Sequence, residues 1–62
     1  MPTITIALNK TSEEKKKQLV ETLSKEAAEI TEIPLEHFLV YVQEHPNENI
    51  GVGGKTLKEI LG

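Results

Sequence analysis

Few residues of this 62-residue sequence carry groups that can do chemistry. There are two histidines, one tyrosine and seven lysines, but no cysteine and no arginine. Pro2 differs from the others because a proline that becomes N-terminal carries a secondary amine, which accepts protons when its pKa lies near the working pH. The same proline is also tolerated at the first position of a strand, where no ladder hydrogen bond is lost. The position of Pro2 alone leaves both interpretations open.

The length and composition limit how the chain is stabilised and what it binds. Below about 70–80 residues a lone core rarely suffices, and small proteins add disulfides, a metal or partner subunits. Without cysteine, a disulfide or a Cys/His zinc site cannot form within one chain, so association of several copies is expected. The net charge of −3 disfavours nucleic acid. No apolar run approaches a membrane span and no signal sequence opens the chain, so we expect a cytoplasmic protein. No metal or organic cofactor is implied.

Two segments have the patterns of β-strands. Residues 2–8 alternate between polar and apolar side chains, with one apolar face formed by Ile4, Ile6 and Leu8. Residues 38–42 are apolar on both faces and rich in β-branched and aromatic side chains, which predicts a second, well-covered strand.

The segment between these strands predicts a long helix that starts at about residue 12. The spacing of Thr11 and Glu14 predicts a capping box at its start, and Pro34 predicts its end near Glu32 or Ile33. Apolar side chains recur at helical spacing and predict one buried stripe, formed by Leu19, Val20, Leu23, Ala27 and Ile30.

A strand, a helix and a strand form a β-α-β unit with parallel strands, so we expect an α+β protein with one domain at residues 1–62. The two-sided apolar character of residues 38–42 predicts that other protomers cover the sheet. Residues 44–49 predict a polar loop, and the glycine-rich residues 50–54 predict a hairpin. A second Thr-x-x-Glu spacing, at residues 56–59, predicts a short terminal helix.

In this order, the features resemble the 4-oxalocrotonate tautomerase family of the tautomerase superfamily over nearly the whole chain. The segments that carry the resemblance are Met1-Pro2 before an alternating strand, Thr11 to Glu14 before a long helix, Pro34-Leu35 before the second strand, and Ile50 to Gly54 near the end. The resemblance implies a hexamer built as a trimer of dimers, with a catalytic proline at each site.

The resemblance also implies a role for Pro2 that suits its chemistry. In the family, the proline nitrogen moves a proton on an enol or 2-oxo acid. Burial in an apolar pocket lowers the pKa of the proline ammonium and makes the nitrogen a base. Met1 must first be removed, because an acylated proline nitrogen is an amide without basicity. We therefore expect a cofactor-independent keto-enol isomerase with Pro2 as general base.

The chain departs from the family at the substrate-binding positions. Family members that act on dicarboxylates use two arginines and a phenylalanine, where this chain has Lys10, Leu39 and Ile50. Each lost charge-assisted contact is worth about 1.5–3 kcal/mol, which favours a less charged substrate. His37 is a further candidate near the site, as a donor or second proton carrier. We expect these four residues to bind substrate, although Lys10 and His37 also fit ordinary surface positions.

Two other polar residues fit non-catalytic positions better, namely His45 as a surface residue and Tyr41 as packing between subunits. The missing arginines leave open a second class of function. In that case the chain is a non-catalytic oligomeric scaffold, or a small-ligand binder, on the same fold.

Overall fold

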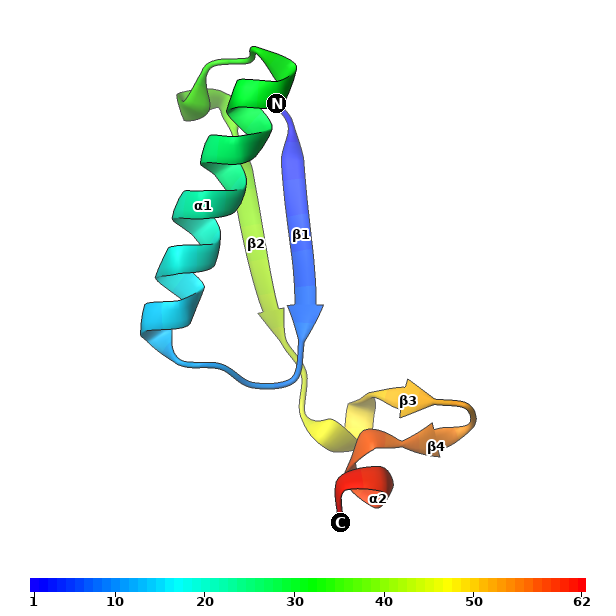
Figure 1. Ribbon diagram of the computed structural model, residues 1–62. Helices are drawn as coiled ribbons and strands as arrows, with labels where there is room; N and C mark the ends of the chain where they lie inside the picture. The colour runs from blue at the N-terminus through cyan, green and yellow to red at the C-terminus, as the bar shows by residue number, and fades with distance from the viewer.

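The computed structural model describes all 62 residues. Its strands and helices, in chain order, are β1 (Thr3–Leu8), α1 (Glu13–Thr31), β2 (Leu39–Glu44), β3 (Gly51–Val52), β4 (Lys55–Thr56) and α2 (Leu57–Leu61). Two short 3-10 turns connect them, η1 (Leu35–His37) before β2 and η2 (Asn47–Asn49) after it. The predicted β-α-β unit and the C-terminal glycine-rich hairpin are both present (Figure 1).

Strands β1 and β2 lie side by side and run parallel, as predicted. The register places Thr3 opposite Leu39 and Leu8 opposite Glu44. The prediction of a strand over residues 38–42 is wrong at both ends, because β2 begins at Leu39 and continues to Glu44. Glu44 therefore belongs to the sheet and not to the loop. The ladder continues this far because β1 offers a partner up to Leu8, whose carbonyl accepts the His45 amide at 2.9 Å.

The start of α1 is capped by a different residue from the one predicted. Ser12 is the N-cap, and its side chain accepts the Lys15 amide at 3.2 Å, so the prediction of Thr11 was wrong. The Thr11 amide instead donates to the Glu44 carboxylate at 2.9 Å. The predicted end of the helix is confirmed, since α1 stops at Thr31 and Glu32 takes the left-handed conformation.

Helix α1 covers one face of the two-stranded sheet (Figure 1). Side chains at this junction are half-buried, and they include Ile4, Ile6, Leu19, Leu23, Ala27, Val40 and Val42. The predicted buried stripe is wrong for Ile30, which is 81% exposed, and Val20 is also exposed. Ile30 lies in the last turn of α1, where no other part of the protomer covers it.

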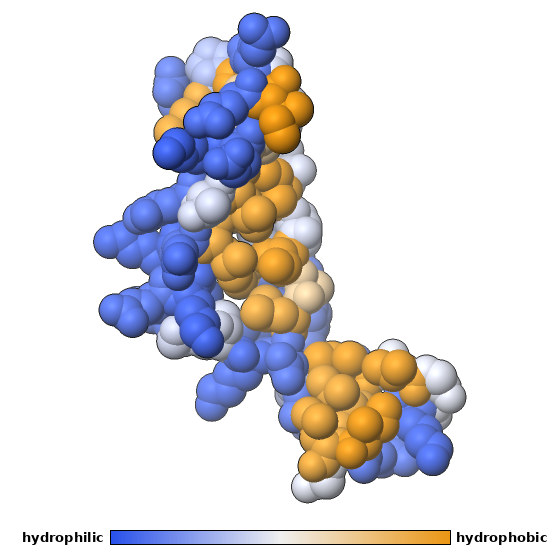
Figure 2. Space-filling view, viewed as in Figure 1, coloured by the Kyte–Doolittle hydropathy of each residue, from blue (hydrophilic) through white to orange (hydrophobic).

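The opposite face of the sheet has no cover within the protomer. It carries Leu39 and Tyr41, the latter 51% exposed, together with polar and small side chains of β1. Below the sheet in Figure 1, β3, β4 and α2 form a separate C-terminal lobe. Figure 2 shows apolar atoms gathered on this lobe, to which Val52, Ile60 and Leu61 contribute exposed side chains.

The lobe has the local structure that the sequence predicts. Gly53 and Gly54 both have positive φ and make the turn between β3 and β4. Thr56 and Glu59 form a capping box at the start of α2, because each side chain accepts the other residue's backbone amide.

The protomer as a whole is extended and lacks a core of its own. Its radius of gyration is 14.7 Å, against about 11 Å for a compact chain of this length. None of its residues is fully buried. The apolar surface therefore exceeds what one copy of the chain can cover.

The cap of α1 yields a first prediction. Glu32 has φ 60°, a conformation that costs a residue with a side chain about 1 kcal/mol relative to glycine. We expect Glu32→Gly to raise the free energy of unfolding by about 0.5–1 kcal/mol, measured by urea denaturation at fixed protein concentration. Glu32→Ala removes the same charge without relieving the backbone, so equal stabilisation by both variants would contradict this interpretation.

Candidate functional site

Three of the predicted site residues lie together at the end of the sheet where β1 begins. The Leu39 amide donates to the Pro2 carbonyl at 3.0 Å, which holds the start of β2 against the residue before β1. His37 lies two residues earlier, exposed, in the turn η1. The N-terminus, the end of α1 and this turn occupy the same end of the molecule (Figure 1). Pro2 itself is half-buried.

The other two predicted site residues lie at the opposite end. Lys10 lies beyond the last residue of β1, and the six residues of this strand, at about 3.3 Å per step, span roughly 17 Å between the Pro2 end and the Lys10 end. Ile50 ends the turn η2 in the C-terminal lobe, where its carbonyl accepts the Leu57 amide at 2.7 Å. The structure therefore does not bring these two residues to Pro2 within one protomer.

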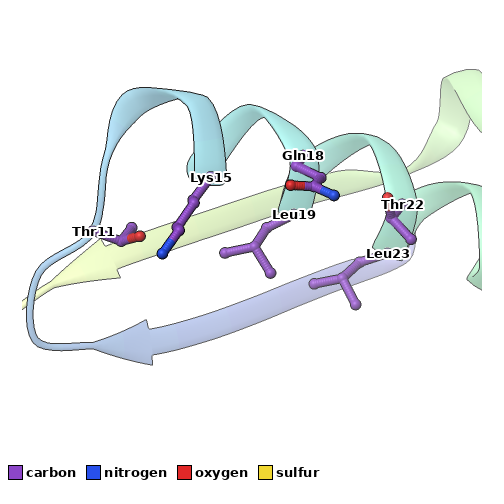
Figure 3. A pocket seen from close by; sticks show the side chains of 6 residues that line it. All are labelled: Thr11, Lys15, Gln18, Leu19, Thr22 and Leu23. Carbon is purple, nitrogen blue, oxygen red and sulfur yellow. The ribbon is translucent and has the colours of Figure 1, made fainter.

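The protomer has three open hollows, and Pro2 lines none of them. The hollow in Figure 3, of about 390 Å³, lies along α1, and its apolar floor is Leu19 and Leu23. A polar hollow of about 330 Å³ lies at the far end of the sheet, between Lys10 and His45. The third, of about 630 Å³, is lined mainly by charged side chains of α1 with Val20, Val40 and Val42. A substrate at Pro2 thus has no enclosing wall within a single copy.

Glu44 forms a cluster at the Lys10 end that sequence reasoning missed. Its Oε2 accepts the Thr11 amide at 2.9 Å, and its Oε1 accepts Lys16 Nζ at 2.7 Å. The Lys16 hydrogen bond, followed by the Thr11 amide, lowers the pKa of the Glu44 carboxyl, and the charge of Lys10 acts in the same direction. No local pattern could reveal this cluster, because its members are 28 and 33 residues apart.

The chain matches known proteins over almost its whole length. A sequence model of the tautomerase family, described as tautomerase enzyme, matches residues 2–60. This chain belongs to the tautomerase family. A curated relative, the 2-hydroxymuconate tautomerase of Pseudomonas putida, is 37% identical over 49 residues, which cover 79% of this chain and 78% of the relative.

Solved structures of the family share the fold. A heterohexameric 4-oxalocrotonate tautomerase from Chloroflexus aurantiacus superposes with a TM-score of 0.89 at 33% identity, covering 97% of this chain and 98% of its own. A 4-oxalocrotonate tautomerase isozyme from Methylibium petroleiphilum superposes with a TM-score of 0.89 at 30% identity, covering 95% and 97%. The predicted α+β tautomerase protomer is therefore confirmed.

Neither helix combines the length and the apolar character that a bilayer span requires. No three His, Asp or Glu side chains gather in a way that could hold a metal ion.

The Glu44 cluster yields a prediction on pH. The pKa of Glu44 is lower in the folded chain than in the unfolded chain. The bonds of its carboxylate therefore stabilise the fold at pH values above the ordinary glutamate pKa of about 4.3, and this stabilisation is lost as the pH falls through the lower pKa of the folded chain. Lys16→Met removes the largest cause of the shift, because methionine has no hydrogen-bond donor. We expect it to raise the pKa of Glu44, measured by NMR titration of the side-chain carboxyl. Lys17→Met, which breaks no ion pair, is the matched control, and equal titration curves in both variants would contradict the assignment.

Proposed function

We propose that this chain, once Met1 is removed, is a keto-enol tautomerase in which Pro2 is the general base. The observation that carries the proposal is the position of Pro2 directly before β1, in a chain that belongs to a family of tautomerases. Exposed apolar side chains, Leu35 and Leu39, lie at the same end. If a partner covers these side chains, Pro2 lies in an apolar environment, which disfavours the charged ammonium and lowers its pKa.

The proposed reaction is balanced without any further reactant. The lone pair of the Pro2 nitrogen accepts a proton from the enol hydroxyl of the substrate as its carbonyl forms. The resulting ammonium then returns a proton to carbon, and the double bond moves. Because substrate and product are isomers, the step needs neither an oxidant nor a cofactor.

The charges around Pro2 favour a substrate with one carboxylate. Leu39, whose amide donates to the Pro2 carbonyl, has an apolar side chain that cannot bind a carboxylate, and the chain has no arginine to hold a second carboxylate. Glu32 and Glu36 lie at the same end of the molecule and disfavour a dianion there. We infer that the substrate is an enol or 2-oxo acid with an uncharged substituent.

We infer that the active site forms between protomers of a homo-oligomer, and a hexamer is the assembly that the family resemblance implies. Three observations support sharing: no residue is fully buried, the outer face of the sheet is uncovered, and Lys10 lies at the opposite end of β1 from Pro2 in the same copy. His37 and Ile50 are proposed as further walls of the shared site.

A second function has its own support. Without arginine, anchoring of a charged substrate is weak, and Pro2 is not basic while Met1 remains attached. A non-catalytic oligomeric binder on the same fold fits these two facts.

The role of Pro2 is tested by turnover. We expect Pro2→Ala to lower kcat/KM for the enol form of phenylpyruvate by about 10²–10⁴-fold, because a positioned base contributes about that much. Ketonisation of the enol is followed by its ultraviolet absorbance, on protein whose intact mass shows loss of Met1.

Two controls separate the base from the fold. Lys25→Ala changes an exposed side chain of α1 that lines none of the three hollows, and it is expected to leave kcat/KM unchanged. A wild-type chain that retains Met1 has the same side chains but an acylated nitrogen, and it is expected to be inactive. Equal activity of the Pro2→Ala and wild-type chains would overturn the proposal, and an inactive processed chain that still binds phenylpyruvate would favour the binder.

The inferred assembly is tested at the uncovered sheet face. Tyr41→Asp places a charge where we expect a partner, and an unpaired buried charge costs about 3–5 kcal/mol. We expect the variant to sediment as a smaller species than the wild type at equal concentration. Lys25→Asp, on the exposed side of α1, is the control, and dissociation of both variants or of neither would contradict this interface.

A further inference from the structure

The only side-chain hydrogen bonds that join distant parts of the protomer meet at the carboxylate of Glu44. The bonds to the Thr11 amide and to Lys16 span 33 and 28 residues, whereas every other side-chain hydrogen bond joins residues at most four apart. Glu44 is the last residue of β2, in register with Leu8 at the end of β1. One carboxylate thus ties the end of the sheet to the start of α1.

This carboxylate holds the loop between β1 and α1 at a defined point. The loop consists of residues 9–12, and its only tertiary hydrogen bond is the one from the Thr11 amide to Glu44 at 2.9 Å. Lys10 is the residue directly before this anchored amide. Fixing the Thr11 amide therefore fixes the backbone from which the Lys10 side chain extends.

The Lys10 ammonium forms no hydrogen bond to Glu44. Lys16 Nζ binds Oε1 of Glu44, and the Thr11 amide binds Oε2. Lys10 forms no ion pair within the protomer, although its charge is near enough to act on Glu44. Lys10 lines the polar hollow beside Glu44 and is exposed.

We propose that Glu44 is a positioning residue, which anchors the residue 9–12 loop through the Thr11 amide and presents Lys10, unpaired, to the carboxylate of the substrate. The proposal rests on the proposed function, because it gives Lys10 a role in substrate binding. Glu44 acts through Lys10 and does not touch the substrate. Since Lys10 binds substrate and transition state alike, loosening the loop affects KM and not kcat.

Three single variants separate anchoring from charge. Glu44→Ala removes both hydrogen bonds, whereas Glu44→Gln keeps an oxygen that can accept the Thr11 amide. Glu48→Ala removes an equal charge from an exposed residue without a hydrogen-bond partner, and it reports the effect of charge alone. Loss of negative charge near an anion site alone lowers KM, so anchoring and charge predict opposite signs.

The expected results follow for enol phenylpyruvate, measured on processed protein. Glu44→Ala raises KM about three- to tenfold with kcat within about twofold of wild type, while Glu44→Gln and Glu48→Ala leave KM at or below the wild-type value. Lys10→Ala raises KM to a similar extent. In the Lys10→Ala background, Glu44→Ala adds no further increase, because the residue through which it acts is absent.

Several outcomes would overturn the proposal. These are an unchanged or lower KM in Glu44→Ala, a loss confined to kcat, or a KM in the double variant that multiplies the two single effects. Amide hydrogen exchange of Thr11 and NMR titration with phenylpyruvate are measured on the same variants and do not depend on turnover. If the wild-type chain binds phenylpyruvate but does not convert it, the proposed function is wrong, and the positioning role of Glu44 is still tested by binding. In that case, the positioning role is contradicted if Glu44→Ala leaves either the amide exchange of Thr11 or the affinity for phenylpyruvate unchanged. It is supported if the variant both exchanges the Thr11 amide faster and binds phenylpyruvate more weakly.

Discussion

The shortage of apolar cover within one protomer governs the rest of this structure. A single helix can cover only one face of a two-stranded sheet, and the C-terminal lobe packs against neither. Apolar side chains consequently remain at the surface on the bare sheet face, at the end of α1 and on the lobe, among them Tyr41, Ile30 and Leu61. Such surface is costly in water, and this cost is the physical basis of the proposal that copies of the chain cover one another.

The same constraint explains why the candidate site is divided. Pro2 and Leu39 occupy one end of the sheet and Lys10 the other, because β1 runs its full length between them. A strand cannot fold back on itself, so the two ends meet only when a second copy supplies one of them. Under the proposed function, chemistry at Pro2 and anchoring by Lys10 depend on assembly, and folding, association and activity become linked.

Glu44 shows how a weak interaction can still determine geometry. Its ion pair with Lys16 is exposed to solvent, and such pairs contribute little to stability. The carboxylate nevertheless makes the only tertiary hydrogen bond to the loop that carries Lys10. A bond of this kind affects the conformation of the loop more than the stability of the fold. Under the proposed function, a defined conformation is what the loop that carries Lys10 needs in order to bind substrate.

Local patterns in the sequence determined much of this protein: the parallel β-α-β unit, the end of α1 before Pro34, the glycine turn, the Thr56 capping box and the short list of residues able to do chemistry. These features depend on residues close together in the chain. The bond of the Thr11 amide to Glu44, the inclusion of Glu44 in β2 and the exposure of Ile30 depend on contacts, or their absence, between distant parts of the chain. The sequence alone therefore misjudged the helix cap, the end of the strand and Ile30. Only the tertiary structure decided that Pro2 and Lys10 lie at opposite ends and that Glu44 joins the sheet to the loop. The reason is physical, since strand register and long-range hydrogen bonds arise only when the chain packs.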